Sequence, residues 1–272
     1  MLRTRILTAL VIFPATLAIV FLLTAAQFRV AIAVLLMIGC WEFRRLADLP
    51  AAAGTALFSL QALLMVLGLF YWNFLQAYAL PLLLAGCVAW LLMFSRLYGY
   101  SPGSVPGSRY RIAGFLSAIA SGLICWFSLS WLHAQADGKL VVFMLLLIIW
   151  ASDTGAYFSG KQFGRRKLAP VISPNKTWEG VYGGLALALV AAFVWSGPLA
   201  HLNIAPLPLV LTTVATALAS IGGDLFISIH KRTVKVADAG RIFPGHGGVL
   251  DRYDSLMAGA PFFALTLGFL TR

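Results

Sequence analysis

The chain has 272 residues, of which 61% are hydrophobic and only 11% are charged. Soluble domains are about 45–50% apolar and about 25% charged, so this composition excludes a soluble globular enzyme, a disordered protein and a disulfide-built secreted module. The net charge is nevertheless +11, from 20 Lys and Arg against 9 Asp and Glu. A very apolar chain with this basic excess is typical of a multi-pass membrane protein whose basic residues lie in loops and at helix ends.

Nine apolar stretches come close to or exceed the roughly 20 residues that a helix needs to cross a membrane. We therefore expect an all-α integral membrane protein with about nine transmembrane helices. The stretches are 6–26, 28–43, 51–72, 74–95, 112–133, 139–158, 178–197, 206–229 and 256–271. No soluble domain fits between them, so residues 1–272 are predicted to form a single membrane domain. Within it we expect lipid-facing N-terminal helices over 1–135, and catalytic helices with cytoplasmic loops over 139–272.

The positions of the basic residues predict the orientation of these helices. If the N-terminus is cytoplasmic, 17 of the 20 Lys and Arg fall in cytoplasmic segments, and only Arg29, Lys139 and Arg272 fall outside. Cytoplasmic loops of membrane proteins are enriched in Lys and Arg. We therefore expect a cytoplasmic N-terminus and a C-terminus on the outside.

The nine acidic residues divide into two groups. Glu42, Asp48 and Asp137 lie at predicted helix ends or in loops, and we expect them to be solvated. The topology brings the other six to one membrane face; they are Asp153, Glu179, Asp224, Asp238, Asp251 and Asp254. A carboxylate within a span costs roughly 2.5–3.5 kcal/mol and normally faces protein, an ion or water. A structural salt bridge is one interpretation of the acids at 153 and 224, and a functional site is the one we favour.

Two polar segments adjoin these acids. Five basic residues lie within 161–176, ahead of a predicted helix N-terminus, which suits phosphate binding, although attraction to anionic headgroups also accounts for them. Thr177 or Ser173 would cap that helix, with Glu179 in its first turn. In 222–255, a glycine-rich PGHGG loop offers backbone N–H groups for an anion.

The same C-terminal segment carries candidate metal ligands and a histidine. Asp251 and Asp254 precede the last predicted helix, three residues apart, and supply the hard oxygen ligands that Mg²⁺ prefers. His246, between glycines, is free to approach a substrate or to bond the backbone. Acids for a metal, basic residues for phosphates and a glycine-rich loop together indicate nucleotide or phosphoryl chemistry. The sequence has no Walker A, Rossmann or HExxH motif.

These motifs carry a resemblance to a known family. The segments SIHKR at 228–232, PGHGG at 244–248 and DRYD at 251–254, with Asp238 between the first two, resemble the signature of phosphatidate cytidylyltransferases (CDP-diacylglycerol synthases). SDTGAY at 152–157, SPNKTWEG at 173–180 and GDL at 223–225 are also similar to that family's pattern. The strong similarity covers about 150–260, and the N-terminal half matches only as generic membrane helices.

The resemblance implies a magnesium-dependent nucleotidyltransferase of phospholipid biosynthesis, at the cytoplasmic face of the cell membrane. It would transfer CMP from CTP to phosphatidic acid, giving CDP-diacylglycerol and pyrophosphate. The implied metal ligands are Asp224 and Asp251. The candidate catalytic residues are Asp153, Asp224, Asp238, His246, Asp251 and Asp254. The candidate substrate-binding residues are Ser173, Lys176, Thr177, Glu179, Ser228, Lys231, Arg232, Gly247, Gly248 and Arg252. The implied cofactor is Mg²⁺, with a second, monovalent cation as an option. CTP, phosphatidic acid and bilayer lipid are the implied partners, without nucleic acid, and a homodimer is left open.

Two residues depart from the family pattern. His230 stands where the family usually has an apolar residue, and Ala237 stands where it usually has Lys, a role that Lys235 could take if the loop shifts. A diverged paralogue that acts on another lipid phosphate is therefore one alternative, and a catalytically silent scaffold is another. A cation-coupled transporter is a third, although its acids would lie near mid-membrane in several spans and internal repeats would be usual.

Overall fold

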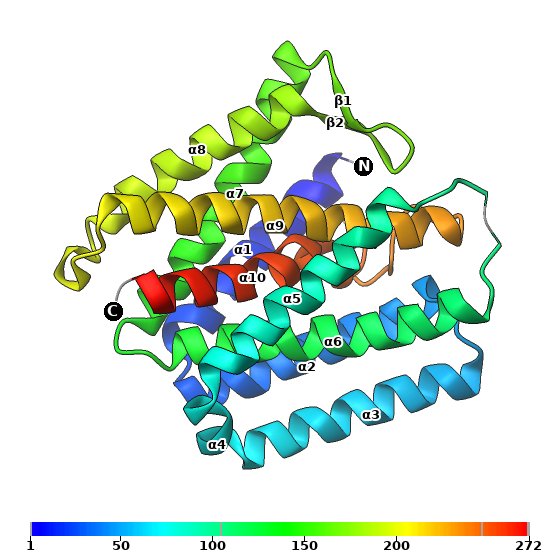
Figure 1. Cartoon of the computed structure of the whole chain (residues 1–272), viewed down its shortest axis with the longest axis horizontal. Helices are drawn as coiled ribbons and strands as arrows, with labels where there is room; N and C mark the ends of the chain where they lie inside the picture. The colour runs from blue at the N-terminus through cyan, green and yellow to red at the C-terminus, as the bar shows by residue number, and fades with distance from the viewer. Residues whose placement is uncertain (1, 104, 246, 271–272) are drawn as a thin grey trace.

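The computed structural model describes residues 2–103, 105–245 and 247–270, and these form ten α-helices, one short 3-10 helix and a two-stranded hairpin (Figure 1). The elements are α1 (Leu2–Leu22), α2 (Ala25–Leu46), α3 (Ala51–Phe70), α4 (Trp72–Ala77), α5 (Ala79–Tyr98), α6 (Ser108–His133), α7 (Gly138–Phe163), β1 (Lys167–Ala169), β2 (Ser173–Thr177), α8 (Trp178–Ser196), η1 (Ala200–Leu202), α9 (Pro206–Thr233) and α10 (Leu250–Leu270).

The apolar stretches form the helices that the sequence predicts. Among the described residues, seven helices are long and apolar enough to cross a membrane: α2, α3, α5, α6, α7, α8 and α9. The protein is therefore an all-α multi-pass membrane protein, as expected. The first and last predicted stretches also overlap helices, α1 and α10. The total of nine spans, the orientation of the termini and the division of the domain at about residue 135 stay predictions.

Several helix boundaries differ from the predicted ones for local reasons. The first break falls at Thr24, because its hydroxyl accepts the backbone N–H of Gln27 while the Gln27 side chain accepts the N–H of Thr24, a reciprocal cap that starts α2. The last helix begins at Leu250 rather than at 256, so Asp251 and Asp254 lie inside α10 and not before it. The loop 161–180 contains an unpredicted antiparallel hairpin, β1–β2.

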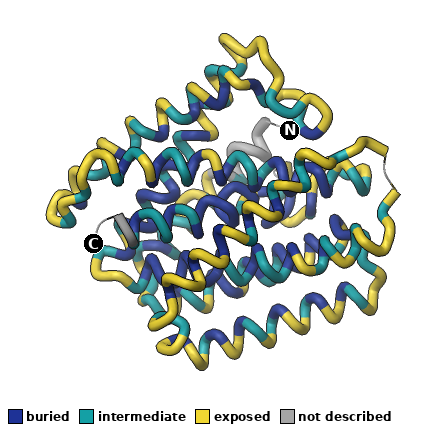
Figure 2. Tube along the Cα trace, in the orientation of Figure 1, coloured by how far each residue is buried: buried dark blue, intermediate teal, exposed yellow. Residues whose placement is uncertain are grey.

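The helices are arranged around a central antiparallel pair. Figure 1 shows α9 and α10 side by side, with α5, α6 and α2 on one flank and α7 and α8 on the other. Figure 2 shows that most of α10, the second half of α6 and much of α9 are buried, whereas α3 alternates between exposed and buried residues. Large apolar side chains such as Leu63, Val88 and Val194 are exposed on α3, α5 and α8. In a membrane protein these surfaces meet lipid rather than water.

A glycine sets the distance between the two central helices. A Cβ built on Gly223 of α9 would lie 2.6 Å from the carbonyl oxygen of Asp254 and 2.7 Å from the Cβ of Ala258, both on α10. Only a residue without a side chain allows this approach. α9 continues unbroken from 206 to 233, so Gly223 permits close packing but does not break the helix. The packing places Asp224 of α9 beside the first two turns of α10.

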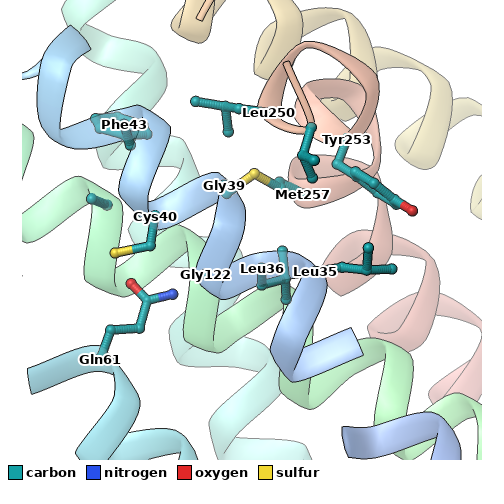
Figure 3. A pocket seen from close by; sticks show the side chains of 12 residues that line it. Leu35, Leu36, Gly39, Cys40, Phe43, Gln61, Gly122, Leu250, Tyr253 and Met257 are labelled. Carbon is teal, nitrogen blue, oxygen red and sulfur yellow. The ribbon is translucent and has the colours of Figure 1, made fainter. Parts of the chain in front are cut away.

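One polar side chain is buried in an apolar contact away from this pair. Gln61 of α3 is fully buried, and within the described chain neither its Oε1 nor its Nε2 has a hydrogen-bond partner. Figure 3 shows its amide directed between α2 and α6, toward Cys40 and Gly122. The cavity there has a volume of about 10 Å³. A buried amide without a partner costs about 1–3 kcal/mol.

Replacing Gln61 with Met is therefore expected to stabilise the protein by about 1–3 kcal/mol, because Met has a similar length and no group that needs a hydrogen bond. Thermal unfolding of the purified protein in detergent measures this as a higher Tm. Gln61→Ala is the matched control and should lower Tm, because it leaves a cavity in the helix contact. A Met variant that melts below the wild type would contradict the expectation.

Candidate active site

A polar cavity of about 460 Å³ lies between α7, the hairpin, α9 and α10. Its walls come from segments that are far apart in the sequence, because the last turns of α7 and α9 and the first turns of α8 and α10 meet at the same end of the bundle. Ten of the predicted site residues line it: Asp153, Ser173, Lys176, Thr177, Asp224, Lys231, Asp238, Asp251, Arg252 and Asp254. Five of the six acids expected to converge do so here.

Asp224 is held by one basic and one hydroxyl partner. The Nζ of Lys176, at the end of β2, lies 2.6 Å from Asp224 Oδ2. The hydroxyl of Ser228, one turn later on α9, donates to Asp224 Oδ1 at 3.2 Å. Lys176 on the hairpin thus forms an ion pair with an acid on the membrane helix α9. Thr177 caps α8, since its side chain accepts the Gly180 N–H at 3.1 Å, and this cap fixes the end of the hairpin.

Asp251 is the best-connected acid of the site. The Lys231 Nζ lies 2.9 Å from its Oδ1, and the backbone N–H groups of Ala239 and Gly248 donate to its Oδ2 at 2.8 and 2.9 Å. Its side chain is only 3% exposed. Backbone donors and an ammonium group stabilise the ionised carboxylate in this position. One N–H group of the PGHGG loop predicted to cradle an anion, that of Gly248, therefore binds this side-chain carboxylate, which itself faces the cavity.

A second, more apolar cavity of about 540 Å³ adjoins the first. It lies between α1, α7 and α10, and its apolar lining includes Ile12, Leu146 and Trp150. The two cavities share a wall of polar residues, which consists of Asp153, Asp251, Arg252, Asp254 and Ser255. A polar chamber and an apolar chamber thus meet at one row of charged side chains.

Among the described residues, five of the predicted site residues do not line the polar cavity. Glu179 lies apart from the converged acids, which corrects the expectation for it: it accepts the backbone N–H groups of Arg165 and Arg166 and the side chain of Arg166. The hydrogen bond between the Arg166 side chain and the Glu179 carboxylate raises the pKa of Arg166 above its ordinary value. Ser228 donates to Asp224, Gly248 donates to Asp251, and Gly247 packs against Asp251 and Asp238. The Arg232 side chain donates to the carbonyl of Ile172. Their substrate contacts stay predictions, and His246 lies outside the described residues.

Three residues at or near the cavity were not predicted from the sequence. Asn175 and Ser255 line the cavity; the first lies in the SPNKTWEG motif, and the second directly follows the DRYD motif. Glu42 was expected to be solvated and is in fact buried, at 6% exposure, against the start of α10. Its partners lie more than 200 residues away in the chain, so nothing in its sequence neighbourhood indicates the contact.

The match to known proteins covers nearly the whole chain and not only the polar segments. The model of the cytidylyltransferase family matches residues 3–270. The chain belongs to the cytidylyltransferase family. A phosphatidate cytidylyltransferase of Pseudomonas aeruginosa is 38% identical over 269 residues, covering 98% of this chain and 97% of the relative. One of Haemophilus influenzae is 35% identical over 97% of this chain and 98% of its own length. The resemblance noted from the motifs is thereby confirmed.

The structure also places the two departures from the family pattern. His230 is fully buried, packs against Phe43 and Phe226, and donates from Nδ1 to the Phe226 carbonyl, so it belongs to the helix core rather than to the cavity. Lys235 lines a different pocket, beside Asp48 and Arg111. In this structure Lys235 therefore does not take the place of the Lys that the family usually has at 237.

Proposed function

We propose that this protein transfers CMP from CTP to phosphatidic acid and releases pyrophosphate, in the synthesis of CDP-diacylglycerol. The observation that carries the proposal is the shared wall between the two cavities. A nucleoside triphosphate needs a polar chamber with positive charge, which the first cavity offers. A lipid phosphate needs apolar space for its acyl chains beside the reacting group, which the second cavity offers. The relatives from Pseudomonas aeruginosa and Haemophilus influenzae are phosphatidate cytidylyltransferases, which supports the choice of lipid.

The reaction requires positioning and charge neutralisation rather than a covalent intermediate. A phosphate oxygen of the lipid forms a new bond to the α-phosphorus of CTP, and the bond from that phosphorus to the bridging oxygen of pyrophosphate breaks. Lys176 and Lys231 in the polar cavity neutralise the triphosphate. Arg252, which lines both cavities, orients the lipid phosphate toward the nucleotide.

Magnesium fits the donor set of the polar cavity. Asp224 and Asp251 both offer hard oxygen atoms to it, and each is balanced by an ammonium group at 2.6 and 2.9 Å. Within the described residues no three acidic, His or Cys side chains form a complete cage for a metal. Mg²⁺ is usually held by one or two carboxylates plus substrate phosphates and water, so two acids suffice. The ion would supply charge neutralisation at the phosphates, and Asp224 and Asp251 would hold it.

The site lies, in this proposal, at the cytoplasmic face of the cell membrane. The polar cavity is at the end of the bundle that carries the basic segments 161–176 and 231–241. Basic loops favour the cytoplasmic side. Cytoplasmic CTP then enters the polar chamber, while the lipid reaches the apolar chamber from the bilayer.

Purified protein in mixed micelles tests the proposal. With phosphatidate, CTP and Mg²⁺ we expect one pyrophosphate released for each CDP-diacylglycerol formed, and none when diacylglycerol replaces phosphatidate, because it lacks the attacking phosphate. Turnover only with a different lipid phosphate would overturn the choice of substrate and favour the diverged paralogue. Ion-driven uptake of a solute without CTP turnover would favour a transporter.

A further inference from the structure

Glu42 is a buried acid outside both the polar and the apolar cavity. It lies near the end of α2 and is 6% exposed. A buried carboxylate is costly unless it is paired or hydrogen-bonded. Its Oε1 accepts the backbone N–H of Val249 at 3.1 Å, and its Oε2 accepts that of Leu250 at 2.8 Å. These two N–H groups open α10, so the acid lies where the helix dipole favours negative charge.

Two glycines leave the space that the carboxylate fills. A Cβ built on Gly240 or on Gly248 would collide with the carboxylate of Glu42. Both glycines belong to the segment 238–250, which runs from the acid at 238 to the first residue of α10. The side chain of Glu42 is therefore enclosed by this segment rather than merely touching it at one point.

Asp251 also binds backbone groups on both parts of this segment. The Oδ2 of Asp251 accepts the N–H groups of Ala239 and Gly248. Asp251 on α10 and Glu42 on α2 thus bind three consecutive backbone N–H groups, Asp251 that of 248 and Glu42 those of 249 and 250. Asp238 and Asp251, which flank the segment, both line the polar cavity.

Near Glu42, α2 and α10 also pack against each other through apolar side chains. Figure 3 shows Leu250 and Met257 of α10 beside Phe43 and Gly39 of α2. A Cβ built on Gly39 would lie 3.9 Å from the Leu250 Cδ1, which is an ordinary van der Waals distance, so α2 and α10 are in direct contact here. This contact fixes Glu42 relative to the start of α10, so the two hydrogen bonds act on a rigid frame.

We propose that Glu42 is a positioning residue for the reaction. It touches no substrate; its carboxylate packs against Gly240 and Gly248 and accepts the N–H groups that begin α10, so that Asp238 and Asp251 keep their places on the cavity wall. The inference rests on the proposed function. The positioning role also explains why α2, a helix of the N-terminal half, carries a buried acid.

Glu42→Ala tests the role, with Glu42→Gln as the variant that keeps the size of the side chain. We expect Glu42→Ala to lower kcat by about 10–100-fold, the usual effect of removing a group that orients a catalytic ligand. KM for CTP should change less than about threefold, since the lysines that face the nucleotide are untouched. Glu42→Gln should lie between, because its carbonyl accepts one N–H while its amide faces the other. Asp48→Asn, at the end of the same helix and paired with Arg111, is the control and should keep wild-type activity.

A second pair of variants separates positioning from general damage. Gly240→Ala should reproduce the loss of Glu42→Ala, because its methyl group displaces the same carboxylate. The double variant should be no worse than either single one, since residues that act through one contact are not additive. Losses that multiply in the double variant, or full kcat in Glu42→Ala, would overturn the inference.

Hydrogen exchange provides a measurement that does not depend on turnover. The amide protons of Val249 and Leu250 should exchange faster in Glu42→Ala than in the wild type, and equally fast in Asp48→Asn and the wild type. Unchanged exchange at 249 and 250 would overturn the positioning contact whether or not the wild type is active. A wild-type protein that turns over no lipid phosphate would instead overturn the proposed function.

Discussion

Asp251→Asn is expected to lower kcat by about 10²–10³-fold, the range seen when one preorganised charged or polar group is removed from a reaction centre. The carbonyl of the Asn can still accept the N–H groups of Ala239 and Gly248, so the loop keeps its shape. The NH₂ group of the Asn then faces the Lys231 ammonium, so two hydrogen-bond donors oppose each other in place of the ion pair. Initial-rate measurements with phosphatidate and CTP, at saturating Mg²⁺, give the change in kcat.

The control for this variant is Asp137→Asn. Asp137 is paired with His201 at 2.8 Å, and neither residue lines the polar cavity. Its loss should leave kcat within about twofold, because the pair lies outside the polar cavity, and it should lower the stability by about 1 kcal/mol or less, as for other exposed ion pairs. Equal activity in the Asp251→Asn variant and the wild type would contradict the role of Asp251. A Tm far below that of the control would show that the loop depends on the charge as well.

Asp224→Asn extends the comparison to α9. The neutral amide would lose its ion pair with Lys176, which is the link between the hairpin and the helix. We expect a similar loss of kcat and, in addition, a higher KM for CTP, because Lys176 is no longer held over the cavity. If only the KM changed, Asp224 would serve to place the lysine and not the reacting groups.

The membrane helices and most of the acidic site were predictable from the sequence, for a simple physical reason. A span must satisfy its backbone internally and must be apolar over about 20 residues, so each one leaves a strong local signal. Acids within or beside such spans are few and costly, so Asp153, Asp224 and Asp254 could be selected one by one. Topology alone then brought them to one end of the bundle.

Features that depend on contacts distant in sequence could not be predicted. The hairpin at 167–177 has no alternation of polar and apolar residues, and it is short, so the pattern rules miss it. Glu42 looks like any acid at a helix end, and only the return of the chain some 200 residues later buries it. The distinction between Glu179 and the converged acids likewise depends on the loop 165–166, whose backbone binds its carboxylate.

Adjacent residues on a helix show the same limit most sharply. Lys231 and Arg232 stand together in one basic motif, and both were predicted to bind substrate. Neighbours on a helix point about 100° apart, because a turn has 3.6 residues. The structure directs Lys231 to Asp251 and the polar cavity, and directs Arg232 to the carbonyl of Ile172 in the hairpin loop. The two residues should therefore differ in their effects on activity.

Lys231→Met is expected to lower kcat/KM by about 10²–10³-fold. The variant keeps the apolar stem of the side chain but removes the charge that faces the triphosphate, and it leaves the buried Asp251 carboxylate without its ammonium partner. Arg232→Met removes one hydrogen bond from an exposed side chain, which is worth about 0.5–1.5 kcal/mol, so its loss should be tenfold at most. The two variants carry the same charge change in the same turn of α9, and steady-state rates with CTP and phosphatidate as the varied substrates compare them directly. Equal losses in both would mean that the motif acts through its overall charge, and that the direction of each side chain does not matter.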